Sequence, residues 1–129
     1  MELESLVIAG TSRTPSIDFN VSNGQFEIAG ASIPEDTLAF YKEIFNWIDQ
    51  YVESPPFTTV VKINLDYFNT SSSKCIYTIF KKLESILKGP WKVEVQWYYD
   101  LKDTDMFESG NDFMQLVKLP FKVIRKEGN

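Results

Sequence analysis

The sequence predicts a mixed α/β fold in which helices cover mainly one face of a sheet. Segments 59–67 and 92–99 alternate between apolar and polar residues, and a helical apolar stripe lies between them. This order is typical of a strand–helix–strand unit with two parallel strands. Parallel strands covered on both faces read as continuous apolar runs, so the alternation predicts two layers, with one sheet face left to solvent or a partner. The length of 129 residues predicts a single domain over 1–129.

The N-terminal part of the chain predicts an antiparallel element beside this unit. Segments 3–9, 16–21 and 25–29 have the composition of strands, and Ser22-Asn23-Gly24 is a turn signal between the last two. The expected sheet is therefore mixed, with antiparallel strands first and parallel strands after them.

Three helices are expected. The first begins at Ser32-Ile33-Pro34-Glu35, which fits a capping box, and ends before Pro55-Pro56. The second lies between the alternating strands, and the third runs from Asp103 to Val117 despite Gly110, before a last strand at 120–124. The side chains expected to face the core are Leu38, Tyr41, Ile44, Phe45, Ile48, Tyr51 and Val52 in the first helix, Ile76, Ile79, Phe80, Leu83, Ile86 and Leu87 in the second, and Val61, Ile63, Leu65, Tyr67, Val93, Val95, Trp97 and Tyr99 in the strands.

Composition argues against several classes of protein. The formal net charge is -5 and no run of Lys or Arg exceeds two residues, which argues against nucleic-acid binding. No segment resembles a signal peptide or an apolar membrane span, so we expect a cytoplasmic protein with no membrane contact. The single cysteine, Cys75, lies in an apolar helical pattern and is expected to be a buried residue rather than a reactive thiol.

Few residues suit catalysis. The absence of histidine removes the commonest general base near neutral pH, and no glycine motif for phosphate binding is present. We therefore expect no enzyme activity and no cofactor. One alternative is a small metal-dependent enzyme that holds a divalent cation with Asp100, Asp103 and Asp105. The interpretation we favour is that these carboxylates suit the positive end of a helix dipole.

A run of hydroxyl side chains marks the start of the second helix. Asn69, Thr70, Ser71 and Ser72 follow a predicted core strand, and any of them suits a helix cap. The same place suits a switch, because a helix N-terminus favours anions and a phosphate adds about -1.5 to -2 charges. The residues alone leave both interpretations open.

The order of several short motifs resembles the SiaC family of bacterial regulatory phosphoproteins over most of the chain. The family's leucine-asparagine-threonine-serine-serine corresponds to Phe68-Asn69-Thr70-Ser71-Ser72, so its phosphorylated threonine falls on Thr70. The residues that carry the resemblance are Gly10-Thr11, Thr14-Pro15-Ser16-Ile17, Pro34-Glu35, Tyr67 to Ser72 with Lys74, Trp97-Tyr98-Tyr99-Asp100 and Pro120-Phe121.

This resemblance implies a fold similar to the SpoIIAA (STAS) anti-sigma-factor antagonists and a partner-switching circuit. A dedicated Ser/Thr kinase is expected to phosphorylate Thr70, with Ser71 and Ser72 as secondary acceptors, and a PPM-type phosphatase to reverse the reaction. Only the unphosphorylated form is expected to bind its target, a diguanylate cyclase, and to promote cyclic di-GMP synthesis and biofilm formation. The expected partner-binding residues are Asn69, Thr70, Ser71, Ser72 and Lys74.

Two further alternatives act by binding. An anti-sigma-factor antagonist would use similar physics on another target, and a constitutive scaffold would carry no phosphate at Thr70. Fold alone does not choose among them.

Overall fold

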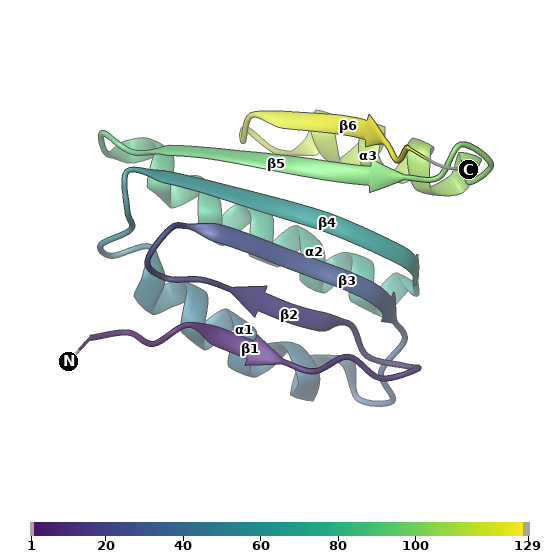
Figure 1. The fold of residues 1–129 in the computed structure, drawn as a ribbon, viewed down its shortest axis with the longest axis horizontal. Coiled ribbons are helices and arrows are strands. Elements are labelled where there is room, and N and C mark those ends of the chain that lie inside the picture. The colour runs from purple at the N-terminus through teal and green to yellow at the C-terminus, as the bar shows by residue number, and fades with distance from the viewer. Residues whose placement is uncertain (1, 128–129) are drawn as a thin grey trace.

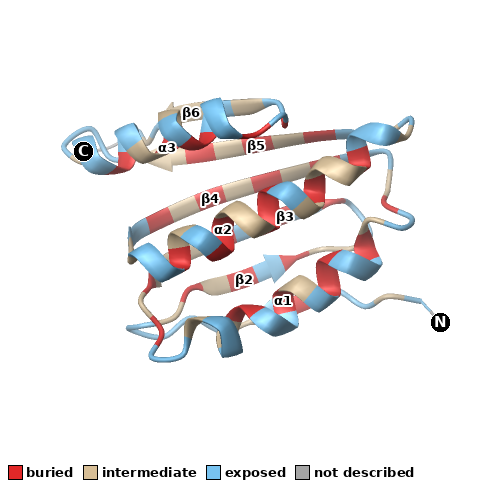
Figure 2. Ribbon diagram, turned by 180° about the vertical axis from the view of Figure 1, so that it is seen from behind, coloured by how far each residue is buried: buried red, intermediate tan, exposed pale blue. Residues whose placement is uncertain are grey.

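A computed structural model describes residues 2–127 and shows a six-stranded sheet with three α-helices packed on one face (Figures 1 and 2). The strands are β1 (Leu6–Ile8), β2 (Ser16–Phe19), β3 (Gln25–Ser32), β4 (Thr58–Phe68), β5 (Lys92–Tyr99) and β6 (Phe121–Arg125). The helices are α1 (Thr37–Tyr51), α2 (Thr70–Leu83) and α3 (Thr104–Leu116), and a 3-10 helix, η1 (Glu84–Lys88), follows α2.

The sheet is mixed, as the sequence predicts. Its spatial order follows the chain, β1-β2-β3-β4-β5-β6. The β1–β2 and β2–β3 pairs are antiparallel, and the remaining pairs are parallel. Val61 of β4 lies between Phe26 of β3 and Val95 of β5, so the inward-facing side chains of neighbouring strands align in rows. Within residues 2–127 all three α-helices lie on the same side of the sheet, behind it in Figure 1 and in front of it in Figure 2, which confirms the predicted one-sided arrangement.

The core lies between the sheet and the helices. Its helix-side residues include the buried Tyr41, Ile44 and Ile48 of α1 and the buried Ile76 and Phe80 of α2. Removing this apolar surface from water is the main driving force for docking the helices on the sheet. Aromatic pairs stabilise the α1 side, where the ring centroids of Phe19 and Phe26 are 4.4 Å apart and those of Trp47 and Tyr51 are 5.1 Å apart.

Cys75 lies in this core, as predicted, with 5% of its surface exposed. Burial raises the pKa of its thiol, which suits an inert packing residue. No helix within residues 2–127 is both long and apolar enough to cross a bilayer.

The predicted capping box at the start of the first helix is wrong. Ser32 is the last residue of β3 and is fully buried, so its hydroxyl cannot reach the first turn of α1 as a cap. The helix instead begins after Asp36, whose Oδ1 accepts a hydrogen bond of 3.1 Å from the N–H of Ala39. Asp36 is an equally good capping residue, and the sequence pattern did not distinguish the two positions.

Tyr67 does not face the core, contrary to the alternating pattern. The β3–β4 register shifts between Gly30 and Ala31, where Gly30 pairs with Leu65 but Ala31 pairs with Tyr67. Gly30 takes a φ of +101°, a conformation that glycine tolerates and that accompanies the irregularity. The extra β4 residue changes the phase of the strand, so Tyr67 is 58% exposed, while Phe68 turns inward and contacts Trp97 with ring centroids 5.8 Å apart.

Element lengths and the exposure of some apolar side chains also differ from expectation. The first strand is short, Leu6–Ile8, and α2 ends at Leu83, so Ile86 enters the core from the 3-10 helix while Leu87 is 39% exposed. Leu38 is 69% exposed in the first turn of α1. Periodicity identifies the apolar face of a helix but not how far along the helix the core extends.

Gly110 explains how α3 forms despite a poor helix residue. A Cβ at this position would lie 2.5 Å from Cδ1 of Trp97 and 2.9 Å from its Nε1. The absence of a side chain lets the helix approach the sheet, where Trp97 Nε1 donates a hydrogen bond of 2.9 Å to the carbonyl O of Met106. Glycine is therefore required by packing rather than by backbone conformation.

Gly110→Ala should destabilise the protein, although alanine normally favours a helix by about 1 kcal/mol over glycine. The added methyl group must displace Trp97, and such overpacking typically costs about 1–3 kcal/mol. Urea denaturation of this variant and of Asp112→Ala, an exposed control on the same helix, measures the difference. A gain in stability for Gly110→Ala would contradict the close approach of α3 to Trp97.

Candidate functional site

All three α-helices begin at one edge of the sheet. They follow β3, β4 and β5 respectively, and these strands are parallel neighbours, so their carboxyl ends and the first helical turns gather together (Figures 1 and 2). The β1–β2 loop reaches the same edge, because the carbonyl O of Arg13 accepts a hydrogen bond of 2.8 Å from the N–H of Ile33. In open α/β sheets this is the edge at which ligands bind. We call residues 9–15, 33–36, 67–72 and 100–103 the helix-start edge.

Thr70 is the first residue of α2 and is exposed at this edge. Asn69 is the helix cap, because its Oδ1 accepts a hydrogen bond of 2.9 Å from the N–H of Ser72. Ser71 is exposed beside Thr70, and Lys74 is exposed one helical turn further on. The sequence left open whether these residues cap the helix or form a switch. Asn69 performs the capping, so the Thr70 and Ser71 hydroxyls are not needed for that role.

The next hydroxyl, that of Ser72, lies in the core. Its Oγ donates a hydrogen bond of 2.8 Å to the carbonyl O of Ser32 and accepts one of 2.8 Å from Ser32 Oγ. The same carbonyl O accepts a bond of 3.1 Å from the N–H of Asn69. Both serine side chains are fully buried. The first turn of α2 is thus attached to the end of β3 by three hydrogen bonds.

Tyr41 of α1 completes this arrangement. Its hydroxyl lies 2.7 Å from Ser32 Oγ. Since the single hydroxyl hydrogen of Ser32 points to Ser72, Tyr41 is the donor in this contact. Burial raises the pKa of Tyr41 to about 12, so the phenol keeps its proton at neutral pH. We call Tyr41, Ser32 and Ser72 the hydroxyl chain.

The structure therefore separates the predicted site residues. Asn69, Thr70, Ser71 and Lys74 lie together on the surface at the start of α2. Ser72 does not fit the expected role of secondary phosphate acceptor or of partner-binding residue, because its side chain is fully buried and its hydroxyl is engaged as donor and acceptor.

Exposed apolar side chains occur along the same edge, and sequence reasoning missed them. Leu38 at the start of α1 is 69% exposed, Tyr67 before α2 is 58% exposed, and Leu101 before α3 is 67% exposed. The first two were assigned to the core by periodicity, whereas Leu101 was visible as an isolated apolar residue among charges. Each of these side chains is available for contact with another protein that docks at this edge.

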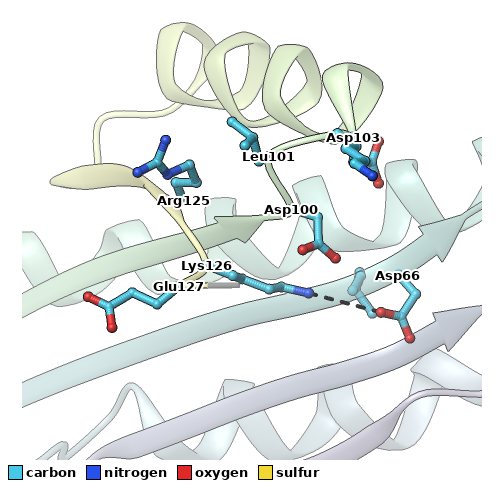
Figure 3. A pocket seen from close by; sticks show the side chains of 9 residues that line it. Asp66, Asp100, Leu101, Asp103, Arg125, Lys126 and Glu127 are labelled. Carbon is cyan, nitrogen blue, oxygen red and sulfur yellow. Dashed lines mark ion pairs between the residues drawn. The ribbon is translucent and has the colours of Figure 1, made fainter. Parts of the chain in front are cut away.

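A hollow of about 990 Å³, lined in part by Leu101, opens at the ends of β4, β5 and β6 (Figure 3). Its charges are of both signs. Asp66 and Asp100 turn toward Lys126, whose Nζ lies 4.0 Å from Asp66 Oδ1 (Figure 3). The hollow therefore has no uniform charge that would select an anion or a cation. Its lining consists of Leu65, Asp66, Asp100, Leu101, Lys102, Asp103, Arg125, Lys126 and Glu127.

The geometry does not support the metal-dependent alternative. Within residues 2–127 no group of three or more Cys, Asp or Glu side chains is arranged to hold a metal ion. Asp103 caps α3, because its Oδ1 accepts a hydrogen bond of 3.0 Å from the N–H of Met106, and Asp105 lies in the first turn of that helix. Asp103 and Asp105 thus stabilise a helix start, the interpretation that the sequence favoured.

A sequence model of the SiaC family of regulatory phosphoproteins matches residues 8–126. The chain belongs to the SiaC family. The predicted family is thereby confirmed, and the chain is a member of a family of regulatory proteins. Several segments that carry the resemblance, such as 10–11, 34–35, 68–72 and 97–100, lie at the helix-start edge or lead into it.

Solved structures from Pseudomonas aeruginosa have the same fold. The crystal structure of apo-SiaC matches with a TM-score of 0.85 and 27% sequence identity, covering 93% of this chain and 98% of that one. The crystal structure of the diguanylate cyclase SiaD in complex with its activator SiaC matches with a TM-score of 0.87 and 26% identity, covering 94% and 99%. A curated protein of strain UCBPP-PA14 is 26% identical over 121 residues, 94% of this chain and 96% of that protein.

A negative charge at Thr70 should leave α2 folded. Thr70→Asp is expected to raise the free energy of unfolding by about 0.3–1 kcal/mol at low salt, since the carboxylate lies at the positive end of the helix dipole. Urea denaturation measures the change, with Thr78→Asp in the middle of α2 as a control that should not share the gain. Destabilisation by Thr70→Asp beyond that of the control would show that a charge at this position acts by melting the helix.

Proposed function

We propose that this protein is a cytoplasmic regulatory adaptor whose unphosphorylated form binds and activates a diguanylate cyclase, so that it raises cyclic di-GMP synthesis and promotes biofilm formation. Phosphorylation of Thr70 by a cognate Ser/Thr kinase abolishes this binding, and a PPM-type phosphatase restores it. The protein acts by binding and not by catalysis.

One observation carries the proposal. The chain shares its fold over 94% of its length with a SiaC that is the activator of a diguanylate cyclase and is seen in complex with it. The phosphorylation part of the proposal is supported by the exposure of Thr70 at a capped helix start. A kinase needs an accessible hydroxyl, and Thr70 and Ser71 at the helix-start edge are accessible. The motif resemblance in residues 68–72 implies that the family's phosphorylated threonine falls on Thr70.

The physical basis of the switch is the cost of burying a charge. A target docked on the helix-start edge would cover Thr70, and we expect it to contact the exposed side chains of Tyr67 and Leu38 as well. A phosphate of about -1.5 to -2 charges in that contact would lose much of its hydration, and a target surface that fits the neutral hydroxyl would offer it no new cationic partner. The unmodified hydroxyl carries no such penalty, so binding depends on the phosphorylation state while the fold stays the same.

An activation assay tests the function directly. The purified protein is mixed with a diguanylate cyclase from the same organism, and cyclic di-GMP formation is measured with unmodified and with kinase-treated protein. Activation by the unmodified form alone is expected. Binding to an anti-sigma factor without any effect on a cyclase would replace the proposal with the antagonist alternative.

Substitutions at Thr70 should reproduce the two states. Thr70→Ala is expected to bind the cyclase about as tightly as the unmodified protein, whereas Thr70→Asp should bind at least about tenfold more weakly, because a buried unpaired charge costs more than about 1.4 kcal/mol. Isothermal titration calorimetry measures both dissociation constants. Equal affinities for the two variants would place the switch elsewhere in the protein.

The exposed tyrosine beside Thr70 should contribute to target affinity. Tyr67→Ala is expected to weaken binding to the cyclase by about tenfold, because buried aromatic side chains dominate protein interfaces. Phe57→Ala is a matched control, since Phe57 is 61% exposed just before the opposite end of the same strand. If both substitutions changed the affinity equally, the target would not dock at the helix-start edge.

A further inference from the structure

The hydroxyl chain joins three separate elements below the exposed Thr70. Tyr41 comes from α1, Ser32 ends β3, and Ser72 lies in the first turn of α2. The successive oxygen–oxygen distances are 2.7 Å from Tyr41 to Ser32 and 2.8 Å from Ser32 to Ser72. All three side chains are 0% exposed. Each hydroxyl donates one hydrogen bond, and the last donation returns to the Ser32 carbonyl O.

We propose that Tyr41, Ser32 and Ser72 are positioning residues of the switch, which hold the first turn of α2 in the one geometry that both the kinase and the target recognise. This inference rests on the proposed function and deepens it. Thr70 and Ser71 touch the partners, whereas the hydroxyl chain acts through them from the core.

The first turn of a helix needs such support. Helix ends fray, and the N–H groups of the first turn have no partners within the helix. A frayed turn would have to be ordered when a partner binds, and that ordering lowers affinity. The attachment of α2 to Ser32 supplies the order in advance, so a partner meets Thr70 and Ser71 already in place.

All hydrogen bonds of the hydroxyl chain are donated in one direction, and Tyr41 is the first donor. Tyr41 donates to Ser32, which donates to Ser72, and hydrogen bonds in a chain strengthen one another in a low-dielectric core. Removal of the Tyr41 hydroxyl takes the first donor away without removing a side chain from the core. Tyr41→Phe is therefore the mildest substitution that weakens the attachment.

The same helix supplies a matched control. Tyr51, at the other end of α1, is 1% exposed and its hydroxyl lies 2.7 Å from Oγ1 of the buried Thr59 in β4. Burial raises its pKa as it does that of Tyr41. Thr59 lies near the beginning of β4, at the end opposite the helix-start edge. Tyr51→Phe thus removes an equivalent buried hydrogen bond far from Thr70.

Hydrogen exchange tests the positioning role without any partner. Tyr41→Phe and Tyr51→Phe should lower the melting temperature by similar amounts. Only Tyr41→Phe should accelerate exchange of the Ser72 and Ser73 amide protons, by about fivefold, which is the effect expected from the net loss of one hydrogen bond. Those amides donate to Oδ1 and to the carbonyl O of Asn69. Equal acceleration in both variants, or none in Tyr41→Phe, would overturn the inference.

Binding of the unmodified variants to the cyclase completes the test. Tyr41→Phe should raise the dissociation constant by about fivefold, and Tyr51→Phe should leave it unchanged. Faster exchange in Tyr41→Phe with unchanged affinity would make the hydroxyl chain merely structural and overturn its role in the switch. Failure of the unsubstituted protein to bind any cyclase would instead count against the proposed function, which separates the two failures.

Discussion

The carbonyl group of Ser32 is the point on which the geometry of the helix-start edge depends. It ends β3 and accepts hydrogen bonds from the Asn69 N–H at 3.1 Å and from Ser72 Oγ at 2.8 Å. These contacts fix where α2 begins relative to the sheet, and the Tyr41 hydroxyl joins α1 to the same place. Because the Ser32 and Ser72 side chains are fully buried, the arrangement is costly to break, since separating α2 from β3 would leave buried polar groups without partners.

This attachment would let the proposed phosphorylation of Thr70 act at the surface alone. Asn69 already caps α2, and the charge of a phosphate at the first helical residue agrees with the helix dipole. The helix therefore has no reason to unfold when it is modified. Under the proposed switch, a docking protein would meet a phosphate of about -1.5 to -2 charges in place of the neutral Thr70 hydroxyl. A rigid scaffold with a changeable surface fits a family of regulatory phosphoproteins.

Sequence reasoning recovered the sheet and the place of Thr70 because both rest on local patterns. Alternation in 59–65 and 93–97 matches buried inward positions, and hydroxyl residues after a core strand match the helix start. It failed where a distant contact decides the outcome. The register shift at Gly30 turns Tyr67 outward, and the partners of Ser32 lie 9 and 40 residues further along the chain, so neither feature leaves a local signal. The role of Gly110 likewise follows from Trp97, which lies on another element.

The register irregularity between β3 and β4 also gives adjacent residues of β4 different constraints, because one must pack in the core and the other lies on the surface. Phe68 must fit against Trp97, so its chemistry is tied to the core. Tyr67, one residue earlier, faces solvent close to Thr70 in the sequence and makes no comparable demand on packing. A substitution at position 67 can therefore alter partner recognition while the packing of the core, and with it the folding stability, is kept.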